Sequence, residues 1–158
     1  MPIDTINILL ADDDKDDCLF FKEALEELEV VAQLTLVADG QQLMHRLRSD
    51  TDRLPDVLFL DLNMPRINGM ECLAEIKQSE KLRQLPVIIF STSYEQEIVN
   101  LLYKSGAQHY IRKPNSFTQL AAVIKQALTF VPVPNERLPI SQANFVLTAK
   151  TGTVRSTS

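Results

Sequence analysis

The stretch Val57-Leu58-Phe59-Leu60-Asp61 is a short apolar run that ends in a carboxylate. Two other runs end in a similar way: Ile8-Leu9-Leu10-Ala11 precedes Asp12-Asp13-Asp14, and Val87-Ile88-Ile89-Phe90 precedes Ser91. Short apolar runs bounded by polar residues are typical of buried strands. Open α/β sheets bind their ligands outside the carboxyl ends of their strands. We therefore expect one site built from several strand ends.

Strand-like runs and helix-like periods alternate along most of the chain. We expect strands at 6–10, 34–37, 57–60, 87–90 and 110–111, and helices around 18–28, 43–47, 70–76, 98–102 and 120–127. Alternation of this kind, repeated five times, predicts a parallel sheet covered by helices on both faces.

Four local patterns predict where helices begin and end. Asn68-Gly69 is expected to form a turn, and Gly106 a left-handed helix cap. Ser116 with Gln119, and Ser93 with Gln96, have the spacing of capping boxes. We therefore assign a capping role to Ser93 and a chemical role to Ser91.

The composition is that of an ordinary globular protein. The chain has 158 residues, 45% hydrophobic and 23% charged, with a net charge of −5. This length favours a single domain, and the acidic balance argues against a nucleic-acid partner. No apolar run is long enough to span a membrane, and no secretory leader is evident. Cys18 and Cys72 fall inside helical patterns, which predicts reduced thiols in a cytoplasmic protein.

The last part of the sequence has a different character. Pro132, Pro134 and Pro139 lie close together, which argues against a continuing helix. A short apolar stretch, 144–147, follows, and the final residues are small and polar. We expect residues 131–158 to be a partly disordered extension, too short and too proline-rich to form an output domain.

Asp12, Asp13 and Asp61 are expected to converge, because the first and third strands are neighbours in a doubly wound sheet. Clustered carboxylates either raise a pKa or bind a cation. A set of oxygen ligands without histidine or cysteine favours Mg²⁺. The alternative is that Asp14 only caps the first helix and the other carboxylates are solvated.

Ser91 and Lys113 stand where a phosphoryl group bound at Asp61 would need them. Ser91 supplies a hydroxyl after the fourth strand, and Lys113 a mobile positive charge after the fifth. Phosphoryl transfer depends mostly on positioning and charge neutralisation. The plain alternatives are helix capping for the serine and a solvated surface position for the lysine.

These motifs resemble the receiver domain of two-component response regulators, from about residue 6 to 128. The matching segments are Ile8-Leu9-Leu10-Ala11-Asp12-Asp13, the run from Phe59 to Gly69, Ile89-Phe90-Ser91, and Tyr110-Ile111-Arg112-Lys113-Pro114. The resemblance implies a flavodoxin-like doubly wound fold over residues 5–130. It implies five parallel strands in the order 2-1-3-4-5, with five helices. Stand-alone regulators of phytochrome-like and hybrid histidine kinases look most similar.

The resemblance also implies roles for individual residues. Asp61 would accept a phosphoryl group from a sensor histidine kinase, and Ser91 and Lys113 would contact that group. Mg²⁺ would be bound by Asp13, Asp61 and the backbone carbonyl of Asn63, with Asp12 acting largely through water. Ser91 and Tyr110 would be the switch residues, and a cis peptide would precede Pro114. The phosphorylated form would bind a downstream target or phosphotransfer protein, and the chain could form a homodimer.

Other functions remain open at this point. The protein could be a phosphorelay intermediate or a phosphate sink. A phosphatase of the haloacid dehalogenase type also has an aspartate nucleophile after a strand, but it needs a second aspartate where Asn63 stands. A constitutive binding module is disfavoured because Asp12, Asp13, Asp61, Ser91 and Lys113 are all present. We expect no enzymatic activity beyond the domain's own phosphorylation and dephosphorylation.

Overall fold

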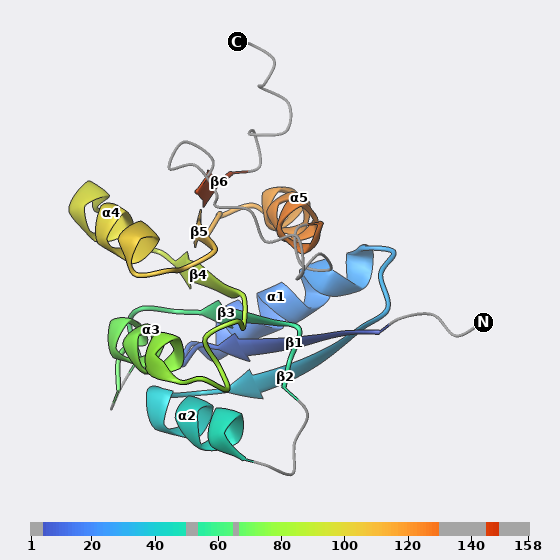
Figure 1. Cartoon of the computed structure of the whole chain (residues 1–158). Coiled ribbons are helices and arrows are strands. Elements are labelled where there is room, and N and C mark those ends of the chain that lie inside the picture. Colours follow the sequence, from blue (N-terminus) through green and yellow to red (C-terminus); the bar gives the residue numbers. More distant parts are fainter. Residues whose placement is uncertain (1–4, 50–53, 65–66, 130–144, 149–158) are drawn as a thin grey trace.

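The computed structural model describes residues 5–49, 54–64, 67–129 and 145–148. Strands and helices alternate along them (Figure 1). The strands are β1 (Ile6–Ala11), β2 (Ala32–Val37), β3 (Val57–Leu60), β4 (Val87–Ser91), β5 (His109–Arg112) and β6 (Val146–Leu147). The helices are α1 (Lys15–Glu27), α2 (Gly40–Arg48), α3 (Gly69–Gln78), α4 (Gln96–Lys104) and α5 (Phe117–Leu128).

The strands form one parallel sheet in the order β2-β1-β3-β4-β5-β6. The doubly wound fold, the five helices and the strand order 2-1-3-4-5 expected from the sequence are therefore confirmed. The sheet differs from the expectation at one edge, where the two-residue strand β6 pairs with β5. Residue Tyr110 pairs there with Val146, and Ile111 with Leu147.

Side chains alternate between the two faces of the sheet, as the two-residue period of a strand requires. Leu58 and Leu60 lie in a cluster with α2, α3 and α4. Val57 and Phe59 lie in a second cluster with α1 and α5. Figure 1 shows these helices as layers on opposite faces of the sheet. The central strands are buried on both sides, which explains their continuous apolar runs.

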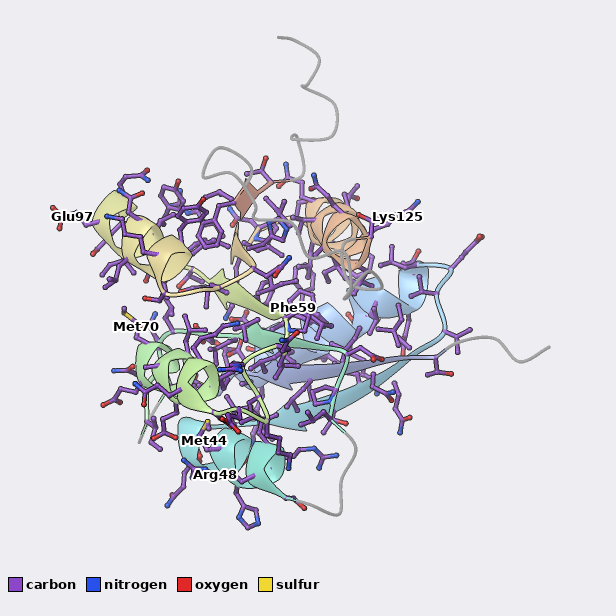
Figure 2. The ribbon with its side chains drawn as sticks, viewed as in Figure 1. Met44, Arg48, Phe59, Met70, Glu97 and Lys125 are labelled. Atoms are coloured by element: carbon purple, nitrogen blue, oxygen red, sulfur yellow. The ribbon has the colours of Figure 1, made fainter. Side chains whose placement is uncertain are left out.

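The helices carry polar side chains on their outer faces. Figure 2 shows Glu97 and Lys125 on the outer sides of α4 and α5, away from the sheet, and both residues are exposed. Among the described residues no helix is both long and apolar enough to cross a membrane.

Helix caps fix where the loops around the sheet begin. The Asp14 side chain accepts a hydrogen bond from the backbone N–H of Asp17 at the start of α1. The expected turn at Asn68 is the start of α3, where Asn68 and Glu71 form a complete capping box. After α4, Gly106 has a φ of 100°, as predicted for a left-handed cap. Ser116 caps α5 by accepting a bond from Gln119 N–H at 3.3 Å.

Two local expectations are wrong. Ser93 does not cap α4, whose N-cap is Glu95 without a side-chain bond. The Ser93 hydroxyl accepts a bond from Asn63 Nδ2 at 3.4 Å, because the Tyr110 hydroxyl, bonded to the Ser93 carbonyl, holds this loop across the site. The described residues contain no cis peptide bond, so the bond before Pro114 is trans, the form that X–Pro bonds also favour intrinsically.

The extension predicted from residue 131 contains an ordered strand. Phe145 and Leu147 are buried, and the backbone carbonyl of Phe145 accepts a bond from Tyr110 N–H at 3.0 Å. The extension also contains the apolar residues Val131, Val133, Leu138 and Ile140, which lie outside the described residues.

Candidate functional site

Three carboxylates meet at the carboxyl end of the sheet. One ligand oxygen from each of Asp12, Asp13 and Asp61 lies within 4.8 Å of the others. Asp12 and Asp61 are buried, whereas Asp13 is exposed. The structure thus brings together the acidic residues expected from the strand ends, and it does not leave them dispersed and solvated.

The register of the sheet produces this convergence. Ala11 on β1 pairs with Leu60 on β3, and the backbone N–H of Asp61 donates to the carbonyl of Ala11 at 2.9 Å. The next residue on each strand therefore reaches the same edge. A side chain at Gly69 would approach the Asp61 carbonyl oxygen to 2.4 Å, so glycine is required where α3 meets the site.

Lys113 closes the site from the loop after β5. Its Nζ lies 2.6 Å from Asp12 Oδ2, 2.8 Å from Asp17 Oδ2 and 3.5 Å from Asp61 Oδ2. Its side chain is only 8% exposed. Burial lowers the pKa of Lys113, but hydrogen bonds to Asp12 and Asp17 outweigh it, so the net direction is upward. Lys113 is not a solvated surface lysine.

Asp61 holds its charge less readily than an ordinary aspartate. Burial raises its pKa to about 6, with a further upward push from Asp12. The Lys113 ammonium and the backbone N–H of Asn63 act in the opposite direction. A cation at the site would offset the repulsion between the carboxylates.

Ser91 lies at the end of β4 with its side chain fully buried. Its Oγ accepts a bond from Ser93 N–H at 3.2 Å, and its carbonyl accepts one from Lys113 N–H at 2.8 Å. Asn63 sits opposite, and its backbone N–H donates to Asp61 Oδ1 at 3.2 Å. The Asn63 side chain also bonds to Ser93 Oγ at 3.4 Å, so the loops after β3, β4 and β5 are joined around Asp61.

Tyr110 points inward and is fully buried. Its hydroxyl donates to the backbone carbonyl of Ser93. Its ring also lines a pocket with Asn63, Met70 and Ile98. The predicted switch tyrosine therefore contacts the loop that directly follows Ser91.

The donor set fits a hard divalent cation. Asp12, Asp13 and Asp61 offer closely spaced carboxylate oxygens, and neither of the free cysteines, Cys18 and Cys72, belongs to the cluster. Such all-oxygen sets suit Mg²⁺ or Mn²⁺ rather than Zn²⁺. The geometry therefore supports divalent cation binding at this edge.

The sequence matches the response regulator receiver domain over residues 8–125. The chain belongs to the response regulator receiver family. It is 30% identical over 127 residues to the response regulator Rcp1 of Synechocystis sp., covering 78% of this chain and 86% of Rcp1.

Solved structures of receiver proteins share the fold. The phosphorylated cyanobacterial phytochrome response regulator RcpA is 32% identical and superposes with a TM-score of 0.75, covering 87% of this chain and 100% of RcpA. The Mn²⁺-bound form of Rcp1 is 28% identical, with a TM-score of 0.73 and coverage of 85% and 99%. The protein is thus a response regulator that functions in two-component signal transduction, and the roles of relay intermediate or phosphate sink are not favoured.

Two features of this receiver were missed at the sequence level. Asp17 contributes a bond to Lys113, although only its membership of an acidic run was visible in the sequence. Phe145 was noted as apolar, but its pairing beside β5 was not foreseen. A helical offset of three residues from the Asp14 cap could have placed Asp17 near the strand ends.

Proposed function

We propose that Asp61 is the phosphoacceptor of this receiver and that a sensor histidine kinase is the donor. The observation that carries the proposal is the position of Asp61: it is buried among Asp12 and Asp13 and faces the Lys113 ammonium at 3.5 Å. Lys113 can neutralise charge on a phosphoryl group at Asp61 from one side, and a cation held by the three carboxylates would do so from another.

In the proposed reaction an Asp61 carboxylate oxygen attacks the phosphorus of a phosphohistidine. The new P–O bond forms as the P–N bond breaks, and the imidazole leaves with the electron pair and takes up a proton. Asp12, Asp13, Asp61 and the backbone carbonyl of Asn63 would hold Mg²⁺. When bound, the ion supplies charge neutralisation for the phosphoryl oxygens.

The remaining residues position and sense the phosphoryl group. Lys113 pairs with one phosphoryl oxygen after giving up part of its bonding to its carboxylate partners. The Ser91 hydroxyl rotates to donate to another oxygen. Because Tyr110 bonds to the loop two residues beyond Ser91, movement of that loop changes the surface around β5. This change is the basis for binding a downstream partner.

The similarity to RcpA supports a kinase of the phytochrome class as the donor, because RcpA is a phytochrome response regulator. We place the protein in the cytoplasm, because Cys18 and Cys72 are both free thiols rather than a disulfide pair. Catalysis is limited to the domain's own phosphorylation and dephosphorylation.

The test is labelling with acetyl phosphate and Mg²⁺, followed by peptide mapping. Label is expected on Asp61 alone and absent from Asp61→Asn, which keeps the shape of the side chain. Lys113→Ala is expected to accept label but to lose phosphorylation-dependent partner binding, because the lysine links the phosphoryl group to the loop after β5. Label that persists in Asp61→Asn would mean that the acceptor is misassigned.

A further inference from the structure

We propose that Asp17 is a positioning residue that holds the Lys113 ammonium away from the phosphoryl site and so limits the affinity of that site for a phosphoryl group. The inference rests on the proposed function, since it concerns the same lysine. Asp17 is not among the residues that the family resemblance identified.

The distances show how the ammonium is shared. Lys113 Nζ lies 2.8 Å from Asp17 and 2.6 Å from Asp12, but 3.5 Å from Asp61. Only the first two are within normal hydrogen-bond distance. The lysine therefore bonds mainly to Asp12 and Asp17 rather than to the carboxylate that would carry the phosphoryl group.

Asp17 reaches the lysine from a helix and not from a strand end. It lies in the first turn of α1, where its backbone N–H is bonded to the capping side chain of Asp14 at 3.0 Å. The cap fixes the backbone of this turn, and the Asp17 side chain is 34% exposed against 0% for Asp12. Asp17 can thus keep or release the lysine without leaving a deeply buried charge unpaired.

The two main partners of Lys113 have different tasks. Asp12 belongs to the carboxylate cluster that fits a cation, whereas Asp17 does not. Asp17 is therefore a dedicated competitor for the ammonium. A phosphoryl group on Asp61 can gain the full bond to Lys113 only by drawing it from Asp17, so removing the Asp17 charge should strengthen phosphoryl binding.

Asp17→Asn tests the proposal, with Asp16→Asn as the matched control. Asp16 lies in the same first turn and is exposed, so its substitution changes the charge near the helix end equally. The probe is beryllofluoride, a phosphoryl analogue, titrated by calorimetry in saturating MgCl₂. Asp17→Asn is expected to bind it about threefold to tenfold more tightly than wild type, the scale of a partly exposed ion pair, and Asp16→Asn to stay within about twofold.

A second measurement tests the contact itself without phosphoryl chemistry. Asp17→Asn, Lys113→Met and the double variant form a thermodynamic cycle of unfolding in metal-free buffer. We expect a coupling of about threefold or more in the unfolding equilibrium constant. A merely structural Asp17 would give coupling but no gain in beryllofluoride affinity.

The outcomes separate the two proposals. Absent coupling, or equal beryllofluoride affinity in wild type, Asp17→Asn and Asp16→Asn, would overturn the role of Asp17 while leaving Asp61 as phosphoacceptor. Coupling together with no beryllofluoride binding by wild type would overturn the proposed function, and the positioning role would fall with it.

Discussion

The hydroxyl of Tyr110 donates to the backbone carbonyl of Ser93, and this bond ties β5 to the loop that follows β4. The ring of Tyr94, in the same loop, meets the Tyr110 ring edge-on with centroids 5.7 Å apart. Arg112 in turn lies 5.9 Å from the centroid of Tyr94. Tyr110 therefore restrains the loop that begins directly after the buried Ser91.

Tyr110→Phe is expected to loosen this loop. The ring remains, but the Ser93 carbonyl loses its donor, so the free energy of unfolding should fall by about 1 kcal/mol. Amide hydrogen exchange over residues 92–95 should become faster. Tyr94→Phe is the control, because its hydroxyl makes only an exposed bond to Gln96 at 3.5 Å. Equal exchange rates in the two variants would show that the Tyr110 hydroxyl does not restrain the loop.

The raised pKa of Asp61 predicts a pH dependence of stability. Since the folded-state pKa, about 6, exceeds the ordinary value of 3.8, the folded protein binds this proton more strongly than the unfolded chain. The contribution of protonated Asp61 is therefore fully present below pH 4 and is lost as pH rises through about 6.

Asp61→Asn removes the free-energy cost of ionising this buried carboxyl group above about pH 6. In metal-free buffer we compare the free energy of unfolding of the variant with that of wild type at each pH. This difference should favour the variant by about 2–3 kcal/mol more at pH 7.5 than at pH 4. Urea unfolding at a series of pH values measures the difference. Asp16→Asn, an exposed site, should track wild type across the range. A constant difference between Asp61→Asn and wild type would contradict the raised pKa.

Much of the fold was predictable because the sequence patterns that specify its strands and helices are local and repeated. The runs ending at Asp12, Asp61 and Ser91 marked buried strands, and their alternation with helical periods is compatible with few topologies. The same strand ends predicted the site, since parallel strands bring their carboxyl ends to one edge. Family resemblance added the full strand order, which spacing alone could not give.

The remaining features depend on contacts that no local pattern specifies. Ser93 has a capping spacing with Gln96, yet its hydroxyl bonds to Asn63 across the site because the loop is held by Tyr110. The bond from Asp17 to Lys113 joins residues 96 positions apart. A helical offset from the Asp14 cap could bring Asp17 near the strand ends, but only the folded arrangement of α1 against the loop after β5 pairs it with Lys113.

Asp13, the exposed residue of the carboxylate cluster, is the clearest position at which to test cation binding. Asp13→Asn should lower the affinity for Mg²⁺ by about tenfold or more, because one of three clustered carboxylates is lost. This affinity is measured by titrating Mg²⁺ and monitoring the amide chemical shifts of residues near Asp61. Asp14→Asn is the control, since asparagine caps a helix as well as aspartate does. Unchanged affinity in Asp13→Asn would remove Asp13 from the site.

The last prediction concerns the segment that carries β6. Phe145 is fully buried, its ring lies 5.3 Å from that of Tyr103, and its carbonyl oxygen is 3.1 Å from His109 Nδ1. Phe145→Ala should therefore lower the free energy of unfolding by about 3 kcal/mol. Val146 is only half-buried, so Val146→Ala should lower the free energy of unfolding by clearly less than Phe145→Ala does.

Deletion from Pro132 onward should destabilise the protein at least as much as Phe145→Ala. It removes the strand that pairs with β5, and Tyr110 N–H loses its bond to the Phe145 carbonyl. Because that bond reaches Tyr110, the residue that we propose as a switch, the alternative expectation is that deletion changes the oligomeric state measured by light scattering, with or without phosphorylation. A truncated protein with the same melting temperature and the same mass in solution would show that this segment neither supports the sheet nor links Tyr110 to self-association.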